Sequence, residues 1–182
     1  MGTPETQLDQ FDNSGYRPGP LPTRALWTIV SGIFFQTWLP WPSAIKCSLL
    51  RIFGATVGSG VVIKPRVTIK YPWNLTVGAH SWIGEFVWID NLDQVNIGDH
   101  VCISQGAMLL CGNHDYKKTT FDLITGPIVL ENGVWIGAKA SVAPGVTCAN
   151  HSVLTMGSIA TKDLAAWQIY HGVPAVAKKL RT

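Results

Sequence analysis

An aliphatic side chain returns every six residues along most of the chain after Val57. Ile, Leu or Val holds 13 of the 15 leading positions, which are 57, 63, 69, 77, 83, 89, 97, 103, 109, 130, 136, 142, 148, 154 and 160. Val, Ala or Ser holds 11 of the 15 fifth positions. A period of six fits neither an α-helix nor an alternating strand, and predicts short strands joined by corners. Three hexads form one coil, and the coils stack into a parallel β-solenoid with the leading side chains inside.

The fourth position of the hexad predicts the corners of each coil. Six hexads have Gly there, as expected where the backbone needs a positive φ. Others have His80, His100 and His151, and His is among the residues other than Gly that adopt this conformation most readily. We therefore assign these three of the five histidines to corners.

The repeat is interrupted once. Successive coils begin at 57, 77, 97, 130 and 148, so the step of 33 between the third and fourth coils contains 15 residues more than a coil of 18. The insertion predicts a loop at about 114–128, and loops on rigid scaffolds often carry function. His114 begins this loop at a sixth hexad position, outside the corners. It is the candidate catalytic residue, unless it only holds the loop with a hydrogen bond.

The two ends of the chain lack the repeat. Residues 1–22 predict an irregular arm, 26–39 a first helix without charge, and Ser43 the N-cap of a second helix with Lys46 and Arg51 on its polar side. Residues 26–53 either cap the open end of the solenoid or contact a membrane surface as interfacial helices. We divide the chain into 1–55 (arm and cap), 56–165 (solenoid) and 166–182 (a C-terminal segment with a short helix near Pro174).

Composition narrows the function classes. Charged residues make up 14% of the chain and hydrophobic residues 47%, a composition that excludes extensive disorder and a coiled coil. The net charge of +3 is too small for a nucleic-acid binder. So low a charge suggests that subunits or a membrane cover part of the surface. The four cysteines have no C-x-x-C spacing and the N-terminus does not resemble a secretory signal, so we expect a cytoplasmic protein with reduced thiols.

Several hexads carry a family resemblance. Val77-Gly-Ala-His-Ser-Trp, Ile97-Gly-Asp-His-Val-Cys and Ile136-Gly-Ala-Lys-Ala-Ser resemble the repeats of hexapeptide acyltransferases. The runs Gly112-Asn-His-Asp-Tyr and Ile63-Lys-Pro-Arg-Val-Thr-Ile-Lys-Tyr-Pro-Trp are similar to the branch of colanic-acid and other exopolysaccharide O-acetyltransferases. The resemblance implies an all-β fold, a left-handed parallel β-helix, and a homotrimer with active sites at the subunit interfaces. It also implies acetyl-CoA as co-substrate, a saccharide acceptor and no metal.

The resemblance also implies roles for single residues. His114 would be the general base that takes a proton from a sugar hydroxyl. Its second ring nitrogen would donate to a backbone carbonyl or to one of four carboxylates, those of Glu85, Asp90, Asp93 and Asp115. We assign catalysis to His114, Asn91 and Asp115, and acceptor binding to Glu85, Asp93 and Tyr116.

The cofactor residues follow from the same resemblance. The backbone N–H of Ala138, after Trp135-Ile136-Gly137, would stabilise the oxyanion. Small side chains at Ala138 and Ala143 would let the pantetheine arm approach. The nucleotide half of acetyl-CoA would contact Ser158, Thr161, Lys162 and Lys179, and Lys178 and Arg181 would be further phosphate contacts. Alternatively, Lys178, Lys179 and Arg181 belong to a solvated C-terminal surface.

Other functions remain open at the level of sequence. Cys111 lies three residues before His114 and could act as a nucleophile. The acceptor could be a free sugar or a streptogramin-type antibiotic. A metal enzyme of carbonic-anhydrase type would need three convergent histidines, and a catalytically inactive scaffold subunit would not bind acetyl-CoA.

Overall fold

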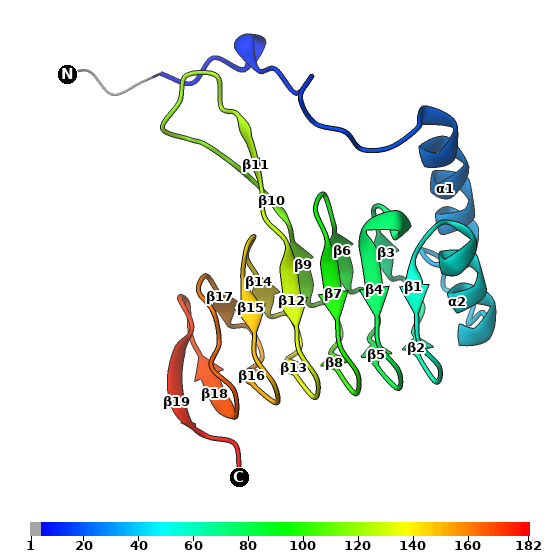
Figure 1. The fold of residues 1–182 in the computed structure, drawn as a ribbon, viewed down its shortest axis with the longest axis vertical. Coiled ribbons are helices and arrows are strands. Elements are labelled where there is room, and N and C mark those ends of the chain that lie inside the picture. The colour runs from blue at the N-terminus through cyan, green and yellow to red at the C-terminus, as the bar shows by residue number, and fades with distance from the viewer. Residues whose placement is uncertain (1–4) are drawn as a thin grey trace.

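The computed structural model describes residues 5–182, and its centre is a three-sided prism of stacked strands (Figure 1). Sheet A contains β1 (Thr56–Val57), β4 (Leu75–Val77), β7 (Val95–Ile97), β12 (Ile128–Leu130) and β15 (Thr147–Cys148). Sheet B contains β2 (Val62–Ile63), β5 (Trp82–Ile83), β8 (Cys102–Ile103), β13 (Trp135–Ile136) and β16 (Val153–Leu154), followed by β18 (Gln168–His171) and β19 (Val176–Leu180). Sheet C contains β3 (Thr68–Ile69), β6 (Trp88–Asp90), β9 (Met108–Leu110), β14 (Ser141–Val142) and β17 (Ile159–Ala160).

The strand pairing follows the six-residue register of the sequence. Val57 pairs with Val77, Ile63 with Ile83, and all strand pairs between successive coils are parallel. The side chains at all 15 leading positions are buried, including the two exceptions to the aliphatic pattern, Cys148 and Ala160. The predicted parallel β-helix of stacked triangular coils is therefore confirmed.

The corner histidines also occupy their predicted places. His80, His100 and His151 have φ of 57°, 56° and 57°. The rings of His80 and His100 stack at 5.2 Å, one coil apart. His151 stacks instead on Trp167 at 4.2 Å. The rings of His80 and His151 fill the space over the corner glycines Gly60 and Gly133, so the corner histidines serve the shape of the coil. Gly112, also at a fourth hexad position, lies in a strand of the inserted hairpin.

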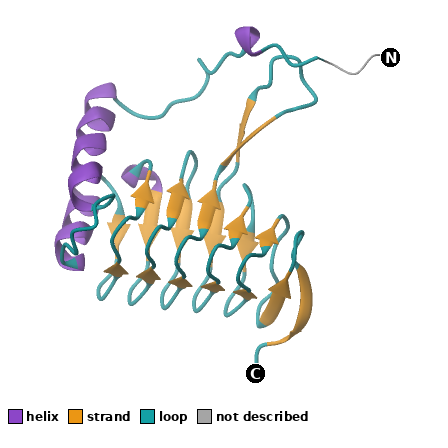
Figure 2. Cartoon of the chain, turned by 180° about the vertical axis from the view of Figure 1, so that it is seen from behind, coloured by secondary structure: helices purple, strands orange, loops and turns teal. Residues whose placement is uncertain are grey.

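Two helices cover the N-terminal end of the prism (Figure 2). They are α1 (Leu21–Phe34) and α2 (Ser43–Ile52), and two single 3₁₀ turns, Leu8–Gln10 and Pro72–Asn74, complete the helical elements of the described chain. Trp27, Phe35 and Leu50 are buried against the first coil. Helix α1 starts five residues earlier than expected, because Pro20 and Pro22 initiate it. The N-cap of α2 is Pro42 and not the predicted Ser43. Within residues 5–182, no helix combines the length and the apolar character that crossing a membrane requires.

The side chain of Lys46 is buried, so its prediction on the polar side of α2 is wrong. Its ammonium group donates to the carbonyls of Ile63 (3.2 Å) and Lys64 (2.9 Å). Burial lowers the pKa of Lys46. These carbonyls belong to the first coil, which has no preceding coil to donate to them. The cap thus supplies hydrogen bonds that the ladder lacks at its end.

The C-terminal segment forms a β-hairpin, so the predicted short helix is wrong. Strand β18 continues sheet B beside β16, and β19 folds back on it antiparallel. The Thr155 N–H donates to the Tyr170 carbonyl, and the Ile159 N–H donates to the Gly172 carbonyl. Exposed N–H groups at the end of a sheet favour another strand over a helix, because a helix cannot pair with them.

Replacing Lys46 with Met tests the hydrogen bonds between cap and ladder. Lys46→Met keeps an unbranched side chain but leaves two carbonyls without this donor. We expect the free energy of unfolding to fall by about 1–3 kcal/mol, measured by urea denaturation followed by circular dichroism. Lys64→Met is the matched control, since the Lys64 side chain is exposed and its change should have little effect. Equal stability of both variants would contradict this account.

Candidate functional site

The inserted residues form a hairpin that leaves the prism where sheets C and A meet. Strand β10 (Gly112–His114) pairs antiparallel with β11 (Leu123–Thr125), and His114 lies opposite Leu123. The Gly126 N–H donates to the Cys111 carbonyl and closes the base of the hairpin. The hairpin extends well beyond the prism (Figure 1). His114 is therefore held on regular backbone that projects away from its own coil.

Hydrogen bonding and stacking fix the orientation of the His114 ring. Nδ1 lies 2.8 Å from the backbone carbonyl oxygen of Phe121. The rings of His114 and Phe121 stack at 4.4 Å with 6° between their planes, and the edge of Phe11 packs at 5.6 Å. A carbonyl only accepts, so Nδ1 carries the proton of the neutral ring. The lone pair of Nε2 is then free to accept a proton, which is the form that a general base needs.

The N-terminal arm forms part of this site, which the sequence did not reveal. The Gln7 N–H donates to the Thr119 carbonyl at the hairpin tip. The Tyr16 hydroxyl donates to the Leu92 carbonyl (2.8 Å) on the prism. A polar hollow of about 270 Å³ lies between arm and hairpin, lined by Asp12, Asn13, Gly15, Tyr16, Asp122, Leu123 and Thr125. Two aromatic residues in a largely polar arm, Phe11 and Tyr16, were the available signal.

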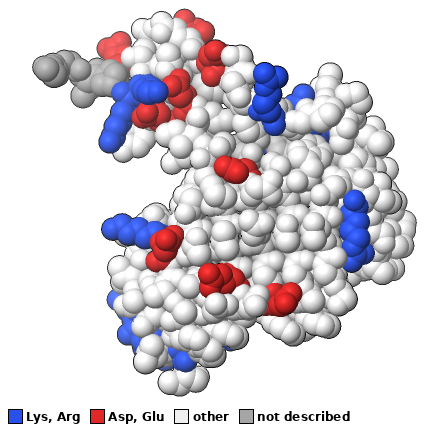
Figure 3. Space-filling view, viewed as in Figure 1, with Lys and Arg blue, Asp and Glu red and all other residues white. Residues whose placement is uncertain are grey.

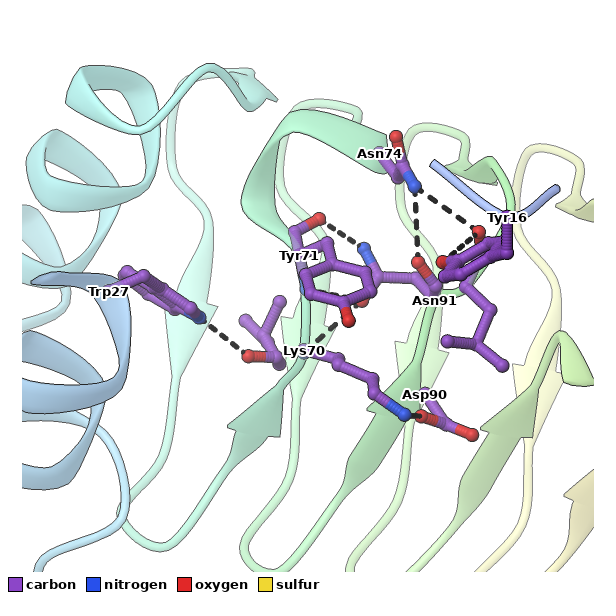
Figure 4. A network of polar contacts seen from close by, with 9 residues as sticks. Tyr16, Trp27, Lys70, Tyr71, Asn74, Asp90 and Asn91 are labelled. Atoms are coloured by element: carbon purple, nitrogen blue, oxygen red, sulfur yellow. Dashed lines mark hydrogen bonds and ion pairs between the residues drawn. The ribbon is translucent and has the colours of Figure 1, made fainter. Parts of the chain in front are cut away.

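The side chain of Asn91 lies in the scaffold beneath the arm. Its carboxamide oxygen accepts from the N–H groups of Lys70 (3.2 Å) and Tyr71 (2.9 Å), and its nitrogen donates to the Tyr71 carbonyl (Figure 4). Asn91 is fully buried. The ion pair of Lys70 with Asp90 (2.9 Å) fastens the same corner. Within this chain Asn91 joins two coils, and its contact with an acceptor stays a prediction.

The other predicted catalytic and acceptor residues are spread over two regions. Asp115 is half-buried and accepts from the Lys117 N–H (3.1 Å), so it shapes the hairpin turn rather than orienting the His114 ring. Tyr116 is 71% exposed on the same hairpin. Asp93 accepts from the Gln94 N–H on the prism, and Glu85 is exposed at a corner between sheets B and C. The Nδ1 partner of His114 is thus the Phe121 carbonyl and none of the four carboxylates.

The candidate oxyanion group lies on a different edge of the prism from His114. Ala138 lies between β13 and β14, where sheets B and C meet. Ala138 is half-buried, and Ala143 follows β14 on sheet C. A groove of about 390 Å³ runs along sheet B toward the same edge and includes Trp82, Gly84, Ser104 and Gln105. The hairpin of His114 leaves the C–A edge, so one prism cannot bring its own His114 to its own Ala138.

The predicted nucleotide-binding residues divide into exposed and buried ones. Thr161, Lys162, Lys178 and Lys179 are exposed near the C-terminal hairpin. Ser158 is buried, where its hydroxyl lies 3.0 Å from that of Thr155 and accepts from the Gly172 N–H. Arg181 donates to the carbonyls of Gly133 (2.9 Å) and His151 (3.1 Å). Ser158 and Arg181 therefore hold the end of the solenoid together.

The geometry disfavours Cys111 as a nucleophile. Cys111 is fully buried, and burial raises the pKa of its thiol to about 11, so it is not a thiolate at neutral pH. Residues 5–182 contain no group of three His, Cys, Asp or Glu side chains placed to hold a metal ion.

The chain is similar to known acetyltransferases along nearly its whole length. No model of a known protein family matches it. It is 37% identical over 172 residues to the protein named colanic acid biosynthesis acetyltransferase WcaF of Escherichia coli, and the match covers 92% of each chain. The chain belongs to the hexapeptide-repeat acetyltransferases. This membership confirms both the predicted family and the predicted enzyme class.

Solved structures of hexapeptide-repeat acetyltransferases share the fold. A galactoside acetyltransferase in complex with coenzyme A is 27% identical with a TM-score of 0.79, covering 88% of this chain and 82% of that one. The hexapeptide-repeat acetyltransferase VCA0836 of Vibrio cholerae O1 biovar eltor, complexed with acetyl-CoA, has a TM-score of 0.79 at 22% identity and covers 88% of each chain.

The tautomer of His114 can be measured directly. We expect the neutral ring to carry its proton on Nδ1, visible in the nitrogen NMR shifts of the selectively labelled imidazole. Phe121→Gly keeps the carbonyl and suits the positive φ of 50° at this position, but it removes the stacked ring. This variant should keep the tautomer while the ring becomes more mobile. A proton found on Nε2 in the wild type would contradict the proposed orientation.

Proposed function

We propose that this hexapeptide-repeat acetyltransferase moves an acetyl group from acetyl-CoA to a sugar hydroxyl during exopolysaccharide synthesis. The similarity to WcaF over 92% of both chains supports this acceptor class. The likeness to a galactoside acetyltransferase that binds coenzyme A supports the donor. We place the reaction in the cytoplasm, where acetyl-CoA is made.

The observation that carries the proposal is the geometry of the His114 ring. With Nδ1–H held by the Phe121 carbonyl, Nε2 takes the proton of the acceptor hydroxyl as its oxygen attacks the thioester carbon. The tetrahedral oxyanion is stabilised by the Ala138 N–H. The C–S bond then breaks, and the departing thiolate of coenzyme A receives the proton from the imidazolium. Transfer is direct, and no acyl-enzyme forms.

The proposed reaction needs two prisms. The His114 hairpin leaves the C–A edge and Ala138 lies on the B–C edge. In a homotrimer with parallel prism axes, an edge of one subunit faces a different edge of its neighbour. The hairpin would then bring His114 to the Ala138 groove of the neighbouring subunit. Acetyl-CoA would lie in that groove, with Thr161, Lys162 and Lys179 near its phosphates.

The acceptor would enter between the hairpin and the arm. The hollow lined by Asp12, Asn13 and Asp122 offers carboxylate and amide groups that hydrogen-bond sugar hydroxyls. Tyr116 is exposed on the same hairpin and presents an aromatic face and a hydroxyl. Glu85 and Asp93 would bind the acceptor from the prism side of the site, and Asn91 would lie at the corner beneath the arm.

A pair of substitutions tests the catalytic assignment. His114→Ala should reduce kcat about 10²–10⁴-fold, because it removes the general base. Cys111→Ala should keep most of the activity, because the buried thiol takes no part. Both are measured by the release of free coenzyme A with an exopolysaccharide repeat unit as acceptor. Full activity of His114→Ala would refute the general base, and activity only toward free sugars or streptogramins would refute the acceptor.

A further inference from the structure

The outer surface of the helical cap is apolar. Trp27 and Ser31 of α1 are buried against the prism, and the opposite side exposes large side chains, with Ile29 at 61% and Ile33 at 51%. We call this surface the cap face; its exposed apolar residues are Leu21, Leu26, Ile29, Ile33, Trp38, Leu39, Ile45 and Ile52. Residues 25–45 contain no charged side chain. A surface this apolar normally has an occupant.

The charge around the cap face has one sign. Residues 13–84 contain no Asp or Glu but seven basic residues, which are Arg17, Arg24, Lys46, Arg51, Lys64, Arg66 and Lys70. The chain has 14 basic and 11 acidic residues in all, so the remainder holds seven basic and 11 acidic residues. The net charge of +3 is thus the sum of +7 in residues 13–84 and −4 in the rest of the chain. Figure 3 shows basic but no acidic side chains at the cap end of this view.

One of these cations, Arg66, borders the cap face beside an aromatic ring. The Arg66 guanidinium lies 4.5 Å from the ring of Trp38, which is 64% exposed. An aromatic ring beside a guanidinium at the rim of an apolar surface is typical of the boundary between lipid headgroups and acyl chains.

The dimensions of the cap suit a helix that lies on a bilayer. Helix α1 has 14 residues, a length of about 21 Å, whereas the hydrocarbon core is about 30 Å thick. An apolar groove of about 570 Å³ continues the cap face toward the first coil, lined in part by Pro22, Leu26, Ile52 and Trp73. Because α1 covers one end of the prism (Figure 2), three prisms with parallel axes would present three cap faces in one plane.

We propose that the cap face docks on an anionic lipid bilayer. The apolar side chains of α1 lie at the acyl boundary, and Arg66 contacts lipid phosphates. Apolar burial and opposite charge act together, as in other interfacial helices. This docking is independent of the acetyl transfer, which takes place beyond the cap on the prism and its hairpin.

Vesicle flotation tests the docking with the full-length protein. The wild type should float with phosphatidylcholine vesicles that contain phosphatidylglycerol, and much less with phosphatidylcholine alone. The double variant Ile29→Glu/Ile33→Glu should bind at least tenfold more weakly, since both side chains lie at the centre of the face. Val176→Glu/Leu180→Glu adds the same charge at exposed positions (50% and 59%) on the opposite end, and should bind as the wild type does.

A charge variant separates the electrostatic part. Arg66→Gln should weaken binding to the anionic vesicles about fivefold, and the loss should be smaller at high salt. Release of coenzyme A with a soluble acceptor should be unchanged in the Ile29→Glu/Ile33→Glu variant, which separates a failure of docking from a failure of the proposed function.

Three outcomes would overturn the docking proposal. One is a wild type that does not float with anionic vesicles. Another is equal binding by the Ile29→Glu/Ile33→Glu variant and its control at the opposite end. The third is a change of oligomeric state in that variant without lipid, measured by light scattering, together with unchanged vesicle binding. That result would assign the cap face to a second copy of the chain.

Discussion

The hydrogen bond from one coil to the carbonyl of the next is the interaction on which the structure depends. The Gly58 N–H donates to the Val77 carbonyl (2.7 Å), and the same bond recurs from coil to coil. Because each coil donates to the carbonyls of the next coil, no coil donates to the carbonyls of Val57, Ile63 and Ile69 in the first one. Side chains of the cap donate to these carbonyls instead: Arg51 on sheet A, Lys46 on sheet B and Trp27 on sheet C. The cap thus completes all three faces of the ladder.

This constraint explains which features could be predicted from the sequence. The hexads report a local steric requirement, so the solenoid, the corner at His80 and the place of the insertion at His114 were predictable. The hairpin that the insertion forms was not predicted. Lys46 was not, because its burial depends on carbonyls 17 and 18 residues away. The hairpin of β18 and β19 replaced an expected helix for the same reason, since an open sheet end required a strand. The hydrogen-bond partner of the His114 Nδ1 atom could not be identified from the sequence, because any residue at position 121 has a backbone carbonyl.

The candidate site divides its tasks between a rigid part and a projecting part. The prism provides Ala138 and the groove along sheet B at fixed positions in the ladder. The hairpin and the arm provide His114 with its proton position set by backbone and its ring held between Phe11 and Phe121. The proposed base and the proposed oxyanion donor thus lie on different parts of the chain, so the proposed reaction depends on how copies of the chain assemble.

The ladder resumes without a shift after the insertion. Leu130 pairs with Ile97 just as Val77 pairs with it on the other side, although the path between the two coils contains 15 extra residues. The scaffold therefore tolerates a change of length at this point at no cost to its own register. Changes of length or sequence at the tip of the hairpin therefore leave the pairing of the coils untouched, and the hairpin can vary independently of the core.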